Sequence, residues 1–100
     1  MKPRIELHKI LINILGSKNV YYQSPINLSY PCIVYEKSGY DTDYADNTLY
    51  RGMTHYTVKL ISKNPDMDTV INKLLEMNYC SFNRRYVSDN LYHDVFDLYY

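Results

Sequence analysis

Two segments of the chain carry apolar side chains every three or four residues, which is the pattern of an amphipathic helix. The first begins at Pro3, which suits the first turn of a helix, and ends at Leu15. Gly16 follows and favours a left-handed C-terminal stop. The predicted apolar face consists of Ile5, His8, Ile12 and Leu15, widened by Leu7, Leu11 and Ile14. We expect this helix to cover a sheet or another helix.

The second helical segment follows Asn64 and Pro65, which break the preceding strand pattern. Asp66 is the expected N-cap, and Asp68 in the first turn complements the positive end of the helix dipole. Apolar residues at helical spacing are Met67, Val70, Ile71, Leu74 and Leu75. The pattern predicts a helix that ends near Met77.

Strand patterns account for most of the remaining chain. A short strand is predicted at 20–23, and a second at 32–35 is apolar on both faces and therefore central. In 55–61 the residues alternate, with Tyr56, Val58 and Leu60 inward and His55, Thr57 and Lys59 outward. Segments 80–87 and 91–99 form a predicted hairpin around the turn 88–90. The element order predicts an α+β fold, a mainly antiparallel sheet with two helices packed on one face.

The connection 36–53 between two predicted strands is too long for a tight turn. We interpret it as a long extended hairpin that leaves the body of the domain and carries contacts rather than core. Its tyrosines, flanked by charged residues, are typical of an interface with anchors and a polar rim. The alternative is that these rings fold back on their own domain. The candidate interface residues are Tyr40, Asp41, Asp43, Tyr44, Asp46, Tyr50 and Arg51, together with Thr57, Lys59, Arg84 and Arg85 on the strands.

Length and composition narrow the class of protein. One hundred residues predict a single domain, 1–100, and eleven basic against eleven acidic side chains create no field that favours nucleic acid or an acidic membrane. Because the net charge is zero, the adjacent Arg84 and Arg85 indicate an ion pair at a subunit interface or a solvated face rather than a nucleic-acid site. Thirteen tyrosines suit an interface, although the codon usage of an AT-rich genome accounts for part of the excess.

The residues that could carry chemistry form no recognisable catalytic set. His8, His55 and His93 have no Ser or Cys nucleophile placed beside them, so we expect no enzyme. Three glycines form no phosphate-binding loop, and we expect no cofactor. The most apolar run, 5–15, is too short to cross a membrane. The sequence therefore predicts a soluble protein without membrane contact.

Neither the acidic cluster nor the cysteines indicate a metal. Asp41, Asp43 and Asp46 resemble part of a calcium loop but lack its turn glycine and bidentate glutamate. Cys32 and Cys80 are far apart in the sequence and form no CxxC motif. We expect them to be buried free thiols in a protein made in a reducing cytoplasm, with no role beyond packing assigned to them.

Four segments, taken in order, resemble small tail-completion proteins of tailed bacteriophages: KPRIELHKILINILGSKNVYYQSP, YPCIVYEKSGYDTDYADN, HYTVKLISKNPDMD and YCSFNRRYVSDNLYHDVFDLYY. The resemblance is closest to the tail terminator group of phages and prophages of Gram-positive bacteria. It covers nearly the whole chain. None of these motifs is a catalytic signature. The resemblance is therefore specific only because several short segments match in the same order along the chain.

The resemblance implies an α+β subunit of a homohexameric ring. Such a ring caps the finished tail tube, stops its polymerisation and presents the surface for head–tail joining. Its partners would be the tail tube protein, the head–tail connector or stopper protein and, in a contractile tail, the sheath protein. DNA would only pass through the channel. The protein would belong to the tail or neck of the virion and be assembled in the cytoplasm of the host bacterium.

Two alternatives remain open at this point. One is a head-side connector or stopper, a head-completion protein that binds the portal side and not the tube. The other is a small nucleic-acid-binding module that uses exposed tyrosines as stacking platforms. Salt-sensitive binding to single strands would distinguish this module from both structural roles.

Overall fold

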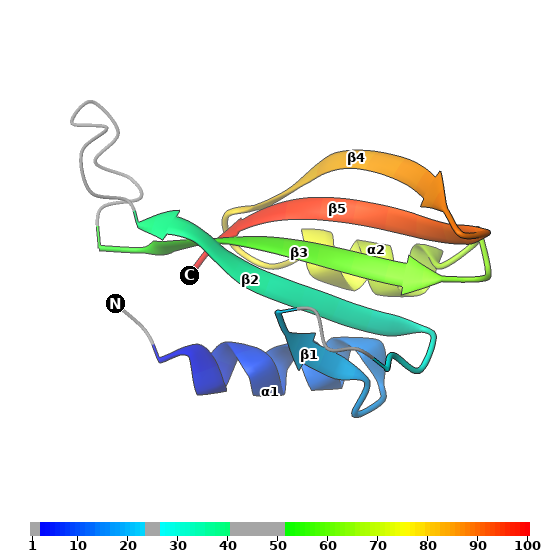
Figure 1. Cartoon of the computed structure of the whole chain (residues 1–100). Coiled ribbons are helices and arrows are strands. Elements are labelled where there is room, and N and C mark those ends of the chain that lie inside the picture. The colour runs from blue at the N-terminus through cyan, green and yellow to red at the C-terminus, as the bar shows by residue number, and fades with distance from the viewer. Residues whose placement is uncertain (1–2, 24–26, 41–51) are drawn as a thin grey trace.

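The computed structural model describes residues 3–23, 27–40 and 52–100, which form two helices and five strands (Figure 1). In chain order the elements are α1 (Arg4–Leu15), β1 (Val20–Tyr22), β2 (Cys32–Tyr40), β3 (Thr54–Ser62), α2 (Asp68–Leu75), β4 (Cys80–Ser88) and β5 (Leu91–Tyr99). The fold class is α+β, as the alternation of helical and strand patterns predicts. No helix within the described ranges is long and apolar enough to cross a membrane.

The strands form one sheet in the order β1-β2-β3-β5-β4. The pairs β2–β3, β3–β5 and β4–β5 are antiparallel. The sequence predicts the first and the last of these pairs, and it does not predict the β3–β5 pair. β1 instead runs parallel to β2, with Val20 opposite Ile33, so the sheet is mixed. A three-residue strand carries no pattern that reveals its direction, which explains why the sequence did not indicate this pair.

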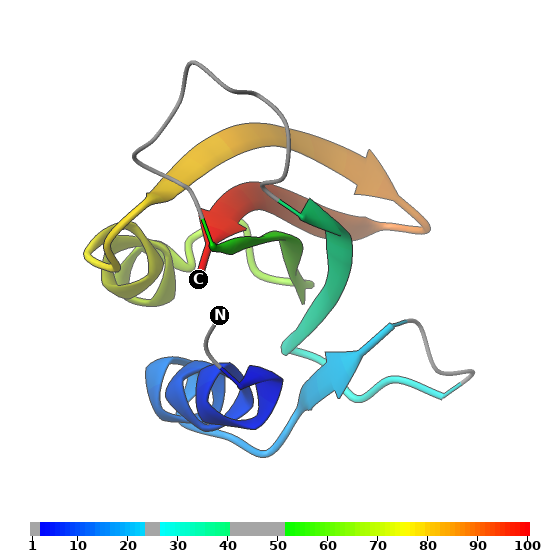
Figure 2. The same cartoon turned by 90° about the vertical axis from the view of Figure 1, so that its left-hand side faces the viewer.

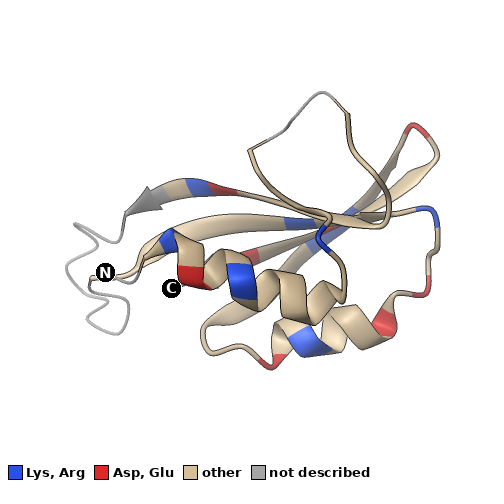
Figure 3. Ribbon diagram, turned by 90° about the horizontal axis from the view of Figure 1, so that it is seen from below, with Lys and Arg blue, Asp and Glu red and all other residues tan. Residues whose placement is uncertain are grey.

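The main core lies between the sheet and the helices (Figures 2 and 3). It contains Leu7 and Leu11 from α1 and Leu74 from α2. The sheet contributes the inward row of each central strand: Ile33, Tyr35, Tyr56, Val58, Leu60, Phe96 and Leu98. The alternation predicted for 55–61 is confirmed, because Tyr56, Val58 and Leu60 are all fully or almost fully buried.

The apolar face of α1 is turned from the predicted position. Leu7 and Leu11 are fully buried, whereas 54% of Ile5, which we expected on the inward face, is exposed. Ile5 and Leu7 are two residues apart and so point to nearly opposite sides of a helix. The helix begins at Arg4, one residue later than predicted, with Pro3 as its N-cap, and ends at Leu15 as predicted. Gly16 follows with a φ of 76°, which is the left-handed stop.

The start of α2 differs from the prediction. The N-cap is Met67 and not Asp66, and no side chain caps the helix. The Asp66 N–H instead donates to the Asn64 side-chain oxygen at 2.9 Å, in a local turn that precedes the helix. The helix also ends at Leu75, earlier than the expected Met77, while Asp68 does occupy its first turn.

The two strand pairs that the sequence predicts, β2–β3 and β4–β5, are antiparallel neighbours in the sheet, with changed strand lengths. β4 and β5 are joined by Asp89 and Asn90, whose φ values of 54° and 62° are those of the tight turn predicted there. β2 continues to Tyr40, which pairs with Thr54, so the connection to β3 begins five residues later than expected. Residues 41–51, which carry most of the predicted extended hairpin, lie outside the described part of the chain.

Candidate interaction surface

The sheet face opposite the two helices carries most of the polar side chains of the strands. Its register places Thr57 between Glu36 and Asp97, and Lys59 between Val34 and Val95. We call this surface the open face; its members are Glu36, Ser38, His55, Thr57, Lys59, Asn83, Arg84, Tyr86, His93, Asp97 and Tyr99. The predicted outward positions Thr57 and Lys59 therefore belong to a larger polar surface.

Two strand irregularities add polar groups to the open face. The pairing of β2 with β3 shifts at Ser38, and the pairing of β4 with β5 shifts at Asn83. Such bulges redirect a side chain that would otherwise follow the alternation. Ser38 makes a hydrogen bond to the Thr57 hydroxyl, and the Asn83 amide donates to Asp97 at 2.8 Å. The strand alternation alone predicts neither bulge, although Gly39 directly follows the first.

A histidine–aspartate pair lies on this polar surface, near the start of β3 and the end of β5. His55 Nε2 and Asp97 Oδ1 are 2.9 Å apart, and about 30% of each side chain is exposed. The second Asp97 oxygen accepts the Asn83 bond, and the Tyr99 ring stacks on His55 with centroids 4.8 Å apart. The pair joins residues 42 positions apart, so sequence inspection could not detect it. The imidazole is held in place, but no Ser or Cys makes a described contact with it.

Cations and aromatic rings lie on β4 and β5 next to the His55–Asp97 pair. Arg84 lies over the Tyr86 ring at 5.5 Å, and Tyr86 stacks on His93 with centroids 4.6 Å apart. Lys59 lies across the sheet from these groups, with Val95 between it and Arg84 in the register. Together with Glu36 and Asp97, these cations give the open face both signs of charge.

The β4 edge is a second exposed surface. Within the described chain β4 pairs only with β5, so one side of this nine-residue strand has no neighbour. Phe82 and Val87 on this strand are 48% and 60% exposed. An unpaired strand with exposed apolar side chains is a common site of contact between chains, although the bulge at Asn83 limits continuous pairing there.

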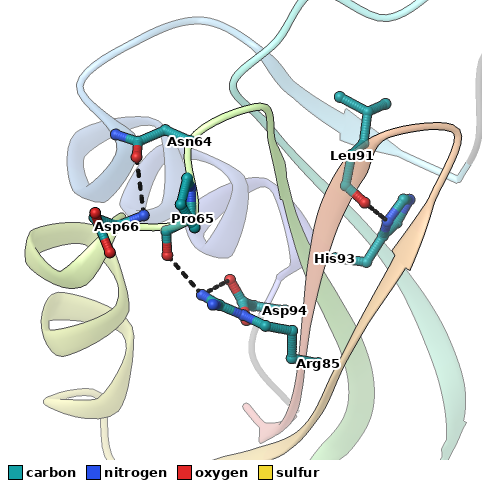
Figure 4. Close-up of polar contacts among 7 residues, drawn as sticks. All are labelled: Asn64, Pro65, Asp66, Arg85, Leu91, His93 and Asp94. Carbon is teal, nitrogen blue, oxygen red and sulfur yellow. Dashed lines mark hydrogen bonds and ion pairs between the residues drawn. The ribbon is translucent and has the colours of Figure 1, made fainter.

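Arg84 and Arg85, predicted together as interface residues, point to opposite faces of β4. Arg85 forms an ion pair with Asp94 on β5, with Nε–Oδ1 and Nη2–Oδ2 distances of 2.6 and 3.1 Å (Figure 4). It also donates to the Pro65 carbonyl at 2.9 Å, which ties the segment before α2 to the sheet. Asp94 is buried and raises the pKa of the Arg85 guanidinium by accepting its hydrogen bonds. Arg85 therefore has an intramolecular partner.

Both cysteines are free thiols, as expected, and neither is placed for nucleophilic chemistry. Cys32 is buried and Cys80 is half-buried. Burial raises the pKa of the Cys32 thiol to about 11, and burial together with the nearby Asp97 charge raises that of Cys80 to about 11. Because the thiolate is the reactive form, both groups are inert near neutral pH.

The lining of the cavity at the start of α2 has few groups that could act in catalysis. This cavity has a volume of about 330 Å³, and its described lining is Tyr30, Pro31, Ser62, Lys63, Asn64 and Met67. This lining contains a single ammonium group and no carboxylate or imidazole that could act as a base. Among residues 3–23, 27–40 and 52–100, no three His, Cys, Asp or Glu side chains come together to hold a metal ion.

The predicted interface residues are thus only partly located. Thr57, Lys59 and Arg84 share the open face, Arg85 points away from it, and Tyr40 ends β2. The others, Asp41, Asp43, Tyr44, Asp46, Tyr50 and Arg51, lie outside the described residues. Sequence reasoning placed His55 on the outward face but missed Asn83 and Asp97, which pairing between distant strands brings to it. Comparisons with protein-family models, with curated proteins and with solved structures found no match.

Proposed function

We propose that this protein is a structural subunit of a phage tail, a tail terminator that acts as a homohexameric ring. The ring caps the tail tube, stops its polymerisation and provides the surface for head–tail joining. The proposal rests on the resemblance of four ordered segments to tail terminators. It is supported by a subunit whose polar groups form an exposed surface rather than a catalytic cleft.

One observation of the fold carries the argument for a ring. A closed ring needs heterologous contacts, in which two different surfaces of each subunit meet. The open face, which is polar with mixed charge, is our first candidate, and segment 40–51, which the sequence pattern assigns to contacts, is our second. A subunit with both can contact a neighbour on each side, as every member of a ring must.

The arm, which we define as residues 40–51, is our candidate for the element that meets the open face of the next subunit. The arm carries Asp41, Asp43 and Asp46 beside Arg51, and the open face carries Lys59 and Arg84 beside Glu36 and Asp97, so each surface has charges of both signs that can pair across the contact. Opposite charges across a contact favour the correct partner and the correct register. The arm tyrosines would then supply the apolar anchors of the same contact.

Replacing Tyr44 and Tyr50 together with Ser should abolish the ring and leave the monomer folded, because the proposed contact loses its two anchors. Light scattering after gel filtration measures assembly, and far-UV circular dichroism measures folding. Tyr30→Ser, which removes a tyrosine that is 38% exposed outside the arm, is the matched control and should still assemble. If the double variant unfolds instead, the arm belongs to the core and the proposal for this contact is wrong.

The assignment to the tube end is tested by mixing purified protein with tail tubes and with isolated head connectors. A terminator should decorate one end of the tube in electron micrographs and stop further addition of tube subunits. The runner-up, a head-side stopper, should bind the connector and leave tube ends bare and growing. Binding to neither structure would contradict both roles.

A further inference from the structure

Tyr35 on β2 is a fully buried tyrosine whose hydroxyl group is contacted by two side chains of α1. Arg4 Nη1 lies 3.0 Å and His8 Nδ1 lies 2.7 Å from this oxygen. The Arg4 guanidinium also lies over the Tyr22 ring at 4.3 Å, and that ring packs edge-on against Tyr35. We call Arg4, His8, Tyr22 and Tyr35 the Tyr35 cluster; it joins the first turns of α1 to β1 and β2.

The hydrogen bonds of this cluster fix the protonation state of His8. A guanidinium has only donors, so the Tyr35 oxygen accepts from Arg4. The hydroxyl proton of Tyr35 then needs an acceptor, and Nδ1 of His8 is at hydrogen-bonding distance. Nδ1 can accept only when it carries no proton, which requires neutral His8 with its proton on Nε2. The hydrogen bonds therefore run from Arg4 to Tyr35 and from Tyr35 to His8.

A second proton on His8 is incompatible with this arrangement. Nδ1–H and the Arg4 N–H would then both donate to the same oxygen, and the hydroxyl proton would lose its acceptor in a buried site. Two cations would also lie on one side of the same hydroxyl group. In agreement with this, desolvation and the Arg4 charge lower the pKa of His8 from its ordinary value of 6.5.

The other elements around His8 supply no charge that would offset this effect. β1 contributes the Tyr22 ring, β2 contributes Tyr35, and Tyr56 on β3 reaches the cluster through its ring contact with Tyr35 at 5.9 Å. From α2, the described core contacts are apolar side chains, namely Met67, Val70, Ile71 and Leu74. No described carboxylate contacts His8, so nothing in the described surroundings stabilises an imidazolium ion.

We propose that the Tyr35 cluster is an acid-sensitive latch: protonation of His8 breaks its bond to Tyr35 and releases the first turns of α1 from the sheet. The folded protein binds the His8 proton less tightly than an opened one. The latch is therefore fully closed above about pH 6.5 and weakens as the pH falls toward the lowered pKa of His8. Leu11 and the Gly16 stop hold the far end of α1, so the change is local.

Amide hydrogen exchange on the intact protein, read by NMR at about pH 7.5 and pH 5, tests the latch. After correction for intrinsic exchange rates, the protection of amides 8–11 should fall about tenfold for each unit by which the fold lowers the pKa of His8. Amides of β3 and β5 should change much less. Direct titration of the three imidazoles by NMR should place the pKa of His8 below 6.5.

The control variant is His8→Asn, whose side-chain oxygen can replace Nδ1 as the acceptor but does not titrate. In this variant α1 should keep its protection at both pH values. Equal protection of wild-type α1 at the two pH values, or a His8 pKa at or above 6.5, would overturn the proposal. So would an undiminished acid effect in His8→Asn, because another group would then be responsible.

Discussion

Arg85→Met is expected to lower the free energy of unfolding by about 3 kcal/mol, because it leaves the buried Asp94 carboxylate without its partner. Only 4% of the Asp94 side chain is exposed, so water cannot replace the two lost hydrogen bonds. The variant also removes the bond to the Pro65 carbonyl, which holds the segment leading into α2. Chemical denaturation followed by circular dichroism measures the change.

Arg84→Met is the matched control, since the adjacent arginine is exposed and contacts only the Tyr86 ring among the described interactions. Its cost should remain within about 0.5 kcal/mol. The double variant Arg85→Met with Asp94→Leu should recover most of the lost stability, because an apolar pair can replace a buried ion pair. Equal costs for the two single arginine variants would show that the Arg85–Asp94 pair does not stabilise the fold.

Leu11→Ala should cost about 3 kcal/mol, because it opens a cavity under α1 where the side chain is fully buried. Leu11 belongs to the same core cluster as Tyr35, Tyr56 and Leu74, so few neighbours can move into the space without losing contacts of their own. Thermal and denaturant unfolding of the purified variant measure the loss.

Ile5→Ala is the comparison that tests the orientation of α1. Ile5 has the same helical setting, but it is 54% exposed, so its truncation should cost well under 1 kcal/mol. The sequence pattern alone assigned Ile5 to the inward face and would give both variants a large effect. A cost for Ile5→Ala equal to that of Leu11→Ala would contradict the orientation of α1 described above.

Local patterns of the sequence predicted the elements and the two pairs of consecutive strands, β2–β3 and β4–β5, but not the pairs β1–β2 and β3–β5. The 3.6-residue period located both helices, and the alternation of 55–61 correctly identified Tyr56, Val58 and Leu60 as inward. The Asp89-Asn90 turn was also visible, because few residue pairs tolerate two positive φ values. These features depend on neighbours in the chain, which is why a single sequence reveals them.

The features that were missed depend on contacts between distant strands. Apolar residues occur around much of α1, so their spacing alone does not show which of them pack against the core of the sheet. The Arg85–Asp94 and His55–Asp97 pairs require the register of β5 against both of its neighbours. The open face could be predicted from Thr57 and Lys59, but its histidine–aspartate pair could not.

The central claim, that the chain assembles through two different surfaces into a hexameric ring, is tested most directly by its mass in solution. Multi-angle light scattering after gel filtration should give about 71 kDa, the mass of six 11.9 kDa chains. Averaged particle images of the same fraction should show a closed ring. A protein that remains at 11.9 kDa at every concentration tested, with or without tail tube, would contradict the claim.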